Sequence, residues 1–364
     1  MRERVWRAER RLALVYDEEY LEHEQHPTHP ERRERLSYTV DRLREEGVLE
    51  VEGVELVEPR PAGREELELV HEPEHVELIR RMSEQGGGII DADTVVTERT
   101  YEQARLAAGG AILAVELVGR GEYDVAFAMV RPPGHHAGRA KAAGFCYFNN
   151  AAIAAEYALR GLNVERIAIL DWDAHHGDGT QEIFYDRDDV LYVSIHQDGR
   201  TLYPGTGFPH EVGEGRGEGY TVNIPVPPGS GDRTYRRAFK RIIDPVVREY
   251  EPDLILISAG QDCHFTDPIT NLAVTARGYE WMMRRAVRLA EEVGAMGPVA
   301  VLEGGYSVEE GLPYTNLAVI CGLAGLPTDL REPTGSPEEN PEGLERVEEV
   351  ARRLSRYWEV LSRS

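Results

Sequence analysis

Residues 167–179 read Ile-Ala-Ile-Leu-Asp-Trp-Asp-Ala-His-His-Gly-Asp-Gly, and this stretch decides the fold. Its first part, Ile167–Leu170, is a short, uninterrupted apolar run, which is typical of a buried strand in a parallel sheet. Its second part, Asp171–Asp178, turns abruptly polar. Because ligand crevices of open parallel sheets lie at the carboxyl ends of the strands, the stretch predicts an α/β fold with a polar site at that edge.

The same pattern recurs along the chain. Apolar runs that read as strands are Leu12–Tyr16, Val125–Val130, Ile167–Leu170, Val190–Ile195, Leu254–Ser258 and Val299–Leu302. Helical stretches between them are Thr100–Val118, Asn149–Leu159, Thr234–Tyr250 and Thr275–Val293. Alternation of strand and helix predicts a doubly wound, mostly parallel sheet flanked by helices. We expect residues 1–364 to form one domain, with a core over about 11–325 and a C-terminal helical extension over 326–364 that serves packing.

Each strand from Val125 onward is followed by a polar, glycine-containing segment. These segments are Arg131–His136, Asp171–Asp178, His196–Gly199, Ala259–Asp262 and Glu303–Tyr306. Since the carboxyl ends of parallel strands meet at one edge of the sheet, the five segments predict one shared site.

A metal site is predicted from three of these residues. Asp173 and His175 are two apart, so in extended chain they face the same side. Asp262 can add a ligand from another strand end. Two carboxylates and one histidine with an open position are typical of catalytic zinc, and the same ligands would also suit Fe²⁺.

A second group of residues can move protons and stabilise charge. Amide hydrolysis needs a base for the water and an acid for the leaving amine, and His135 and His136 can fill both roles. Asp171 and Asp178 are the nearest carboxylates that could orient the two imidazoles. Tyr306 follows two glycines after a strand, where its phenol could donate to a developing oxyanion.

These segments resemble the histone deacetylase and acetylpolyamine amidohydrolase superfamily. The resemblance rests on the motifs RPPGHH, GFCYFNN, DWDAHHGDG, YPGTG, SAGQD with a following DP, and LEGGY, in that order, from about His26 to Leu323. It implies an arginase-like α/β fold with a central, mostly parallel sheet of about eight strands. It also implies a hydrolase that releases acetate from acetyl-lysine in proteins or peptides, or from acetylpolyamines.

The resemblance implies a role for each matched residue. Asp173, His175 and Asp262 match the zinc ligands. His136 matches the general base and His135 its electrostatic partner. Asp171 and Asp178 match the carboxylates behind them, and Tyr306 matches the tyrosine that polarises the carbonyl.

A substrate tunnel and potassium sites are implied in the same way. Phe145 and Tyr203 match the aromatic pair around the substrate chain, Gly144 a backbone contact, Ile269 the variable gate, and Arg32 the arginine near the acetate exit. A first K⁺ site is matched by Asp171, Asp173, His175, Ser194 and Ile195, and a second by Phe184, Arg187, Val190 and Tyr220.

Two departures from the family pattern keep other functions open. Gln261 replaces an aromatic residue before Asp262, and His264 stands where a small residue is expected, so it could be a rim group or an extra ligand. Because arginase relatives carry Asp-Ala-His sequences, a binuclear manganese ureohydrolase is one alternative. A non-catalytic acyl-amine-binding protein on the same fold is another.

Composition limits the partners. The net charge is −24 with no basic stripe, which argues against nucleic-acid binding and favours cationic ligands. No apolar run is long enough to span a membrane, and the first ten residues lack the apolar stretch of a signal peptide, so we expect a cytoplasmic protein. Three separated cysteines argue against a disulfide framework. The sequence leaves the oligomeric state, including a homo-oligomer, open.

Overall fold

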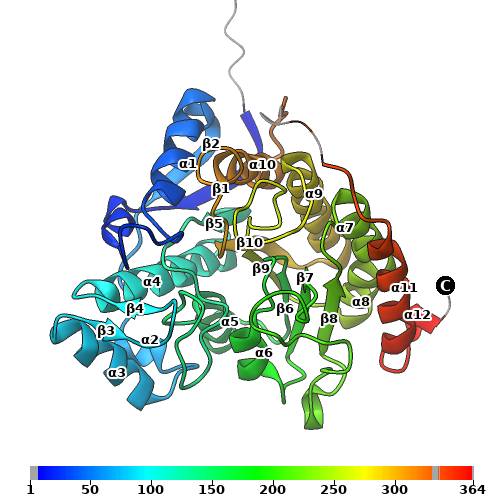
Figure 1. Ribbon diagram of the computed structural model, residues 1–364. Coiled ribbons are helices and arrows are strands. Elements are labelled where there is room, and N and C mark those ends of the chain that lie inside the picture. The colour runs from blue at the N-terminus through cyan, green and yellow to red at the C-terminus, as the bar shows by residue number, and fades with distance from the viewer. Residues whose placement is uncertain (1–6, 330–334, 336, 363–364) are drawn as a thin grey trace, which may run out of the picture.

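An eight-stranded parallel sheet runs through the middle of the protein, which a computed structural model describes for residues 7–329, 335 and 337–362 (Figure 1). The strands are β1 (Arg7–Val15), β2 (Glu52–Val57), β3 (Gly88–Ile89), β4 (Val95–Val96), β5 (Val125–Ala128), β6 (Ile167–Asp171), β7 (Val190–Gln197), β8 (Thr221–Val226), β9 (Leu254–Ala259) and β10 (Met296–Leu302). The sheet has the order β2-β1-β5-β10-β9-β6-β7-β8, and β3 and β4 form a separate antiparallel pair.

The helices connect these strands. They are α1 (Glu34–Glu45), α2 (Arg64–Leu67), α3 (Pro73–Glu84), α4 (Thr100–Gly119), α5 (Asn150–Gly161), α6 (Asp178–Phe184), α7 (Asp232–Ala238), α8 (Asp244–Tyr250), α9 (Ala276–Val293), α10 (Leu312–Ala324), α11 (Glu342–Leu354) and α12 (Glu359–Ser362). A π-helical turn, Phe239–Ile243, joins α7 to α8, and 3₁₀ turns cover Glu18–Glu22, Val48–Glu50 and Gly215–Gly217.

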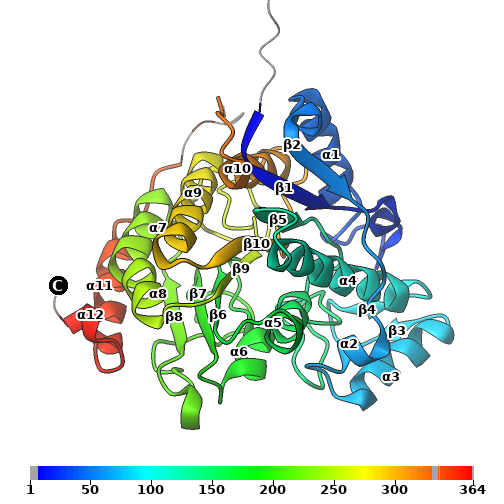
Figure 2. The same cartoon turned by 180° about the vertical axis from the view of Figure 1, so that it is seen from behind.

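The sheet lies between two groups of helices, and both groups can be followed in each of the two opposite views (Figures 1 and 2). The helices α4 and α5 pack on each other and on β1, β5, β6, β9 and β10. The helix α10 packs on both α1 and α9, and α9 and α10 pack on β1, β5 and β10. The central strands β5, β6 and β9 are therefore buried along their whole length, as uninterrupted apolar runs require.

Local sequence sets the helix ends. The Asn149 side chain accepts a hydrogen bond from the Ala152 amide at 3.0 Å and caps α5. Thr275 caps α9 in the same way, by accepting from the Gly278 amide at 3.1 Å. At its other end α9 stops at Gly294, whose φ of 73° is a left-handed conformation that favours glycine.

The predicted fold class is confirmed, and each predicted strand and helix has a counterpart. Four strands were missed: the short pair β3 and β4, and β2 and β8, which form the two edges of the main sheet. Glu52 and Glu55 interrupt the apolar pattern of β2, and β8 carries Pro225, which an edge strand tolerates because one row of its amides needs no partner.

The C-terminal helices cover the β8 side of the sheet. α11 packs against β8 and α7, and α12 packs against α8 (Figure 1). The sequence also predicts an exposed loop over Pro333–Pro341, and residues 330–334 and 336, in or beside it, lie outside the described part. None of the helices that the structure describes is both long enough and apolar enough to cross a membrane.

Candidate active site

The polar segments predicted to form one site follow strands that are neighbours in the sheet. β5, β10, β9 and β6 lie side by side in that order, and all of their pairings are parallel. Residues that follow these strands, around His135, Asp173, Asp262 and Tyr306, are therefore carried to one edge of the sheet. The convergence follows from sheet order alone, before any side chain is placed.

Asp173, His175 and Asp262 form a buried cluster whose candidate ligand atoms all lie within 4.8 Å of one another. His175 Nδ1 is 2.9 Å from Asp262 Oδ2 and 3.1 Å from Asp173 Oδ1. A Cβ on Gly304 would lie 2.6 Å from Oδ2 of both aspartates, so the glycine allows the backbone to approach them. Within the described residues this is the one group of three or more His, Cys, Asp or Glu side chains close enough to share an ion.

The electrostatics of this cluster suit a bound cation. Burial by itself lowers the pKa of His175, but the hydrogen bonds to Asp173 and Asp262 raise it to about 10. The two buried carboxylates therefore surround the imidazole with negative charge. Two carboxylate oxygens and one imidazole nitrogen are the donor set of a hard or borderline divalent metal ion, so the residues fit such an ion.

The two histidines before this cluster are each held by a carboxylate. His135 Nδ1 donates to Asp171 Oδ2 at 3.1 Å, and His136 Nδ1 donates to Asp178 Oδ1 at 2.7 Å. The ring centroids are 4.1 Å apart. Nε2 of His136 is left for exchange with a ligand or water, whereas Nε2 of His135 lies 3.7 Å from Asp173 Oδ1.

The two imidazoles differ in charge. Burial lowers the pKa of His135, but Asp173 and Asp171 outweigh this effect and raise it well above 6.5. Burial and the neighbouring His135 lower the pKa of His136 to about 4, despite Asp178. A neutral His136 beside a charged His135 can accept a proton at neutral pH.

Tyr306 reaches the same site from the segment after β10. Its backbone N–H donates to Asp267 Oδ2 at 2.7 Å, which fixes the turn that carries the phenol. Gly305 before it has a φ of 123°, a conformation that favours glycine. The Tyr306 ring meets Phe145 edge to face, with 5.6 Å between the ring centroids.

A cavity of about 250 Å³ opens onto these groups. The predicted tunnel residues Gly144, Phe145, Tyr203 and Ile269 all line it, together with His135, His136, His175 and Tyr306. Asp93 and Leu202 complete the mouth and were missed by sequence reasoning. The Tyr203 ring meets the His136 ring edge to face, with 5.1 Å between the ring centroids. This aromatic wall of the cavity therefore contacts the histidine that can accept a proton.

Of the five residues predicted to bind substrate, Arg32 is the one that does not line this cavity. Its side chain is 43% exposed and lies 3.7 Å from the carboxylate of Glu34. Arg35, one helical turn later, is fully buried; its Nε donates to the Gly305 carbonyl at 2.7 Å, and its guanidinium lies 4.9 Å from the centre of the Tyr306 ring. Because α1 packs on α10, the face of α1 that carries Arg35 turns inward. The arginine beside the site is therefore Arg35, which corrects the choice of Arg32.

A buried ion-pair network behind the site also escaped the sequence reasoning. Glu31 accepts hydrogen bonds from Arg131 at 2.5 and 2.9 Å and from Arg35 at 3.0 Å, and all three side chains are fully buried. Glu303 is a second buried carboxylate whose role was not predicted. Its Oε2 accepts hydrogen bonds from the backbone amides of Gly134, at 2.7 Å, and His135, at 3.1 Å. Glu303 begins the polar segment Glu303–Tyr306 that the sequence already singles out, and its position directly after the apolar run of β10 is the signal that could have revealed it.

The residues matched to potassium lie along β6 and β7 and the segments beside them. Ser194 is the register partner of Asp171, and its Oγ lies 2.8 Å from His196 Nδ1. Of the second set, the Phe184 carbonyl accepts from the Arg187 amide at 3.1 Å, and the Tyr220 carbonyl accepts from the Tyr192 amide at 2.9 Å. Val190 and Ile195 are buried in β7.

The two departures from the family pattern are both buried. His264 Nδ1 is 2.8 Å from Thr266 Oγ1, and His264 is not part of the candidate metal cluster. Its burial places it away from the rim. Gln261 lies beneath Gly305, where an added Cβ would come within 2.9 Å of Gln261 Cβ.

Comparison with known proteins agrees with this geometry. Residues 29–322 match the histone deacetylase domain. The chain is 56% identical over 360 residues to a "Probable deacetylase" of Archaeoglobus fulgidus, covering 95% of this chain and 98% of that one. It is 40% identical over 313 residues to a "Histone deacetylase-like amidohydrolase" of Pseudomonas aeruginosa, covering 85% and 79%. The crystal structure of the HDA15 HD domain superposes with a TM-score of 0.88 at 36% identity, covering 96% of each chain.

Proposed function

The chain belongs to the histone deacetylase domain family, and from this premise we propose that it is a zinc-dependent deacetylase. Its substrates would be N-acetylated cationic amines, either acetyl-lysine in proteins or peptides, or acetylpolyamines. One observation carries the proposal: a buried two-carboxylate, one-histidine cluster, a carboxylate-bound neutral histidine and a tyrosine all meet at one aromatic-walled cavity.

The metal ligands in this proposal are Asp173, His175 and Asp262. When bound there, Zn²⁺, or Fe²⁺ in its place, supplies a Lewis acid that lowers the pKa of water and polarises a carbonyl. K⁺ ions at the two sites matched from sequence would help to fix β6 and β7 behind these ligands.

His136 performs the proton transfers. Because Asp178 accepts from its Nδ1, Nε2 carries the free lone pair and takes a proton from the attacking water. The same Nε2–H then protonates the departing amine nitrogen as the C–N bond breaks, so acetate and a free amine leave and the imidazole is neutral again. His135, charged and held by Asp171, stabilises negative charge as it develops nearby.

Tyr306 and the aromatic walls position the substrate. The phenol lies in the cavity, where its O–H can donate to the carbonyl oxygen as it becomes an oxyanion. Phe145 and Tyr203 can contact a slim alkyl chain on two sides, and Gly144 leaves its backbone open to the amide nitrogen. Ile269 gives the mouth an apolar gate. Arg35 lies behind Tyr306, on the side where acetate would have to leave.

The test combines metal analysis with turnover. The purified protein should contain one zinc per chain and should deacetylate at least one of an acetyl-lysine peptide, acetylputrescine and acetylspermidine. Asp262→Asn should lose both metal and turnover, whereas Asp124→Asn, a surface aspartate paired with Arg11, should keep both. Full zinc and full turnover in the Asp262 variant would refute the ligand assignment.

Metal content also separates the alternatives. Two manganese ions per chain and no deacetylation would favour the ureohydrolase-like enzyme. Stoichiometric binding of an acetylated amine without turnover would favour the non-catalytic binding protein.

A further inference from the structure

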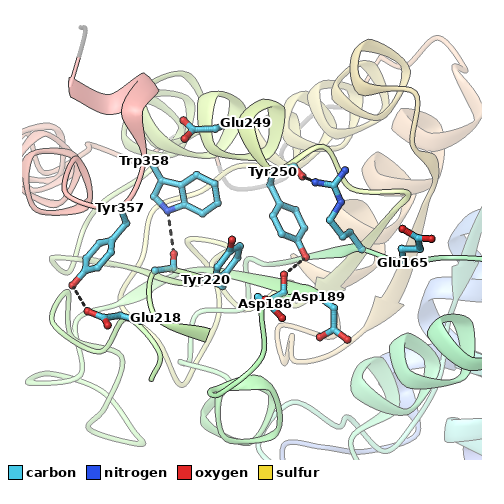
Figure 3. A pocket seen from close by; sticks show the side chains of 11 residues that line it. Glu165, Asp188, Asp189, Glu218, Tyr220, Glu249, Tyr250, Tyr357 and Trp358 are labelled. Atoms are coloured by element: carbon cyan, nitrogen blue, oxygen red, sulfur yellow. Dashed lines mark hydrogen bonds between the residues drawn. The ribbon is translucent and has the colours of Figure 1, made fainter. Parts of the chain in front are cut away.

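A second cavity, of about 530 Å³, opens at the amino ends of the strands, whereas the catalytic cavity lies at their carboxyl ends. Figure 3 shows the side chains that line it. It is about twice the volume of the catalytic one. Its lining includes Arg166 just before β6, Asp189 just before β7 and Tyr220 just before β8. The catalytic residues follow their strands, whereas these residues precede theirs. The two cavities therefore lie at opposite ends of the strands, separated by the length of a strand.

One wall of this cavity comes from the C-terminal helices. Tyr357 and Trp358, between α11 and α12, line it, and Trp358 Nε1 donates to the Gly219 carbonyl at 3.0 Å. The match to the histone deacetylase domain ends at residue 322, so this wall lies outside the matched region. Tyr220, which was matched to the second potassium site, is the one lining residue that also belongs to the site predicted from sequence.

Three aromatic rings form the floor. The ring centroids of Tyr220 and Tyr250 are 5.7 Å apart, those of Tyr220 and Trp358 are 5.8 Å apart, and those of Tyr250 and Trp358 are 6.5 Å apart. Figure 3 shows the three rings grouped around one space. Aromatic faces attract cations, and the protein already uses one of them in this way, because the Arg166 guanidinium lies 5.7 Å from the Tyr250 ring centre.

The charge of the lining also favours a cation. Its carboxylates outnumber its single arginine and are Glu165, Asp188, Asp189, Glu218 and Glu249. Asp189 is neutralised by Arg187, which holds it at 2.7 and 2.8 Å. Glu249 accepts hydrogen bonds from two backbone amides at the start of α12, at 3.2 and 3.0 Å. The remaining carboxylates surround the aromatic floor instead of converging on one point.

We propose that this cavity binds a free polyamine, an alkyl chain with several ammonium groups. The aromatic floor suits the alkyl segments and the carboxylates suit the separated charges. A metal ion would need ligand atoms gathered together, and the one such cluster in the described part of the chain is at the catalytic site. An anion is disfavoured by the negative lining. The proposal does not depend on the reaction at the catalytic site.

Calorimetric titration of the full chain with spermidine tests the proposal. The double variant E165Q/E218Q removes two charges from the cavity at exposed positions. Its matched control is E58Q/E65Q, because Glu58 and Glu65 are also exposed. Glu58 follows β2, the outer strand on the side of the sheet away from β8. Spermidine affinity should fall roughly tenfold in the cavity variant and stay unchanged in the control, since any binding in the catalytic tunnel is common to both.

A second variant tests the aromatic part. Tyr357 is a fourth aromatic residue of the lining and is partly exposed, so Tyr357→Leu leaves the three packed floor rings in place. It should weaken spermidine binding roughly two- to fivefold. A neutral diol of the same length should not bind, and spermidine affinity should fall as salt rises, because exposed charges are screened beyond about 10 Å at 0.1 M. Wild-type affinity in both cavity variants, or equal binding of the diol, would overturn the proposal.

Discussion

Replacing Glu31 with glutamine should destabilise the protein strongly. The Glu31 carboxylate is fully buried and accepts three hydrogen bonds from two arginines, Arg131 and Arg35, which are also fully buried. Glutamine keeps the shape but removes the charge and turns an amide N–H₂ toward a guanidinium. Two buried positive charges then lack a counter-ion. Removing one partner from a buried ion pair costs about 3–5 kcal/mol, so we expect a loss of that size in the free energy of unfolding.

The same segment of chain supplies a matched control. Glu24 accepts a hydrogen bond from Arg33 at 2.6 Å, but both side chains are about half exposed. Surface pairs contribute about 0.2–1 kcal/mol, so Glu24→Gln should cost no more than that. Urea unfolding followed by tryptophan fluorescence measures both variants against the wild type. Equal midpoints for Glu31→Gln and Glu24→Gln would refute the reasoning.

The pH dependence of this effect has a definite sign. Burial would raise the pKa of Glu31, but Arg131 and Arg35 outweigh it and hold the pKa well below its ordinary value. A carboxylate with a lowered pKa stabilises the fold above its unfolded pKa, and this contribution is lost as pH falls below that value. The gap between wild type and Glu31→Gln should therefore be full at pH 7 and narrow below about pH 4.5. A gap that stays constant at acidic pH would mean that charge is not its cause.

Three further outcomes are expected at and around the site. Tyr306→Phe should lower kcat by roughly 10²–10³ with metal content unchanged, measured by deacetylase assay and elemental analysis, because one oxyanion donor is lost. Gly304→Ala should lose bound metal, measured by the same elemental analysis, since its Cβ would lie 2.6 Å from Oδ2 of both Asp173 and Asp262. His71→Gln should flatten the fall of Tm with acid. Burial lowers the pKa of His71 to about 3, so the unfolded chain binds that proton first and stability falls from about pH 6.5 toward 3. Thermal unfolding scans between about pH 6.5 and 3 measure this. An equal slope of Tm against pH in the wild type and in His71→Gln would contradict the prediction.

The sequence is most informative where one short segment carries both structure and chemistry. Asp173 and His175 are two residues apart at the end of an apolar run, so their common direction and their place at the sheet edge follow from local geometry. The polar segments after the strands also predict that Asp262 joins them. The structure gives the reason, because β9 neighbours β6 in the sheet.

What could not be predicted depends on tertiary packing. Arg32 and Arg35 are three residues apart on the same segment, and only the docking of α1 on α10 decides which side chain is buried. The second cavity could not be predicted from the sequence for a similar reason. Its lining combines Glu165 with Trp358, which are far apart in the chain. Of the edge strands, β2 was missed because glutamates stand at its exposed positions. β8 was missed because Thr221, Asn223 and Pro225 break its apolar pattern although the strand is buried.

The order of strands in the sheet has a consequence for synthesis on the ribosome. β5 pairs with β1 on one side and waits for β10 on the other, and β6 pairs with β7 but waits for β9. Until Leu302 has left the ribosome, two central strands carry open edges, and open edges can pair with other chains. Tyr306 and Asp262 arrive with the same late segment. Chains that stall before it should therefore lack activity altogether, and they should aggregate or be held by chaperones until the last two strands of the sheet emerge.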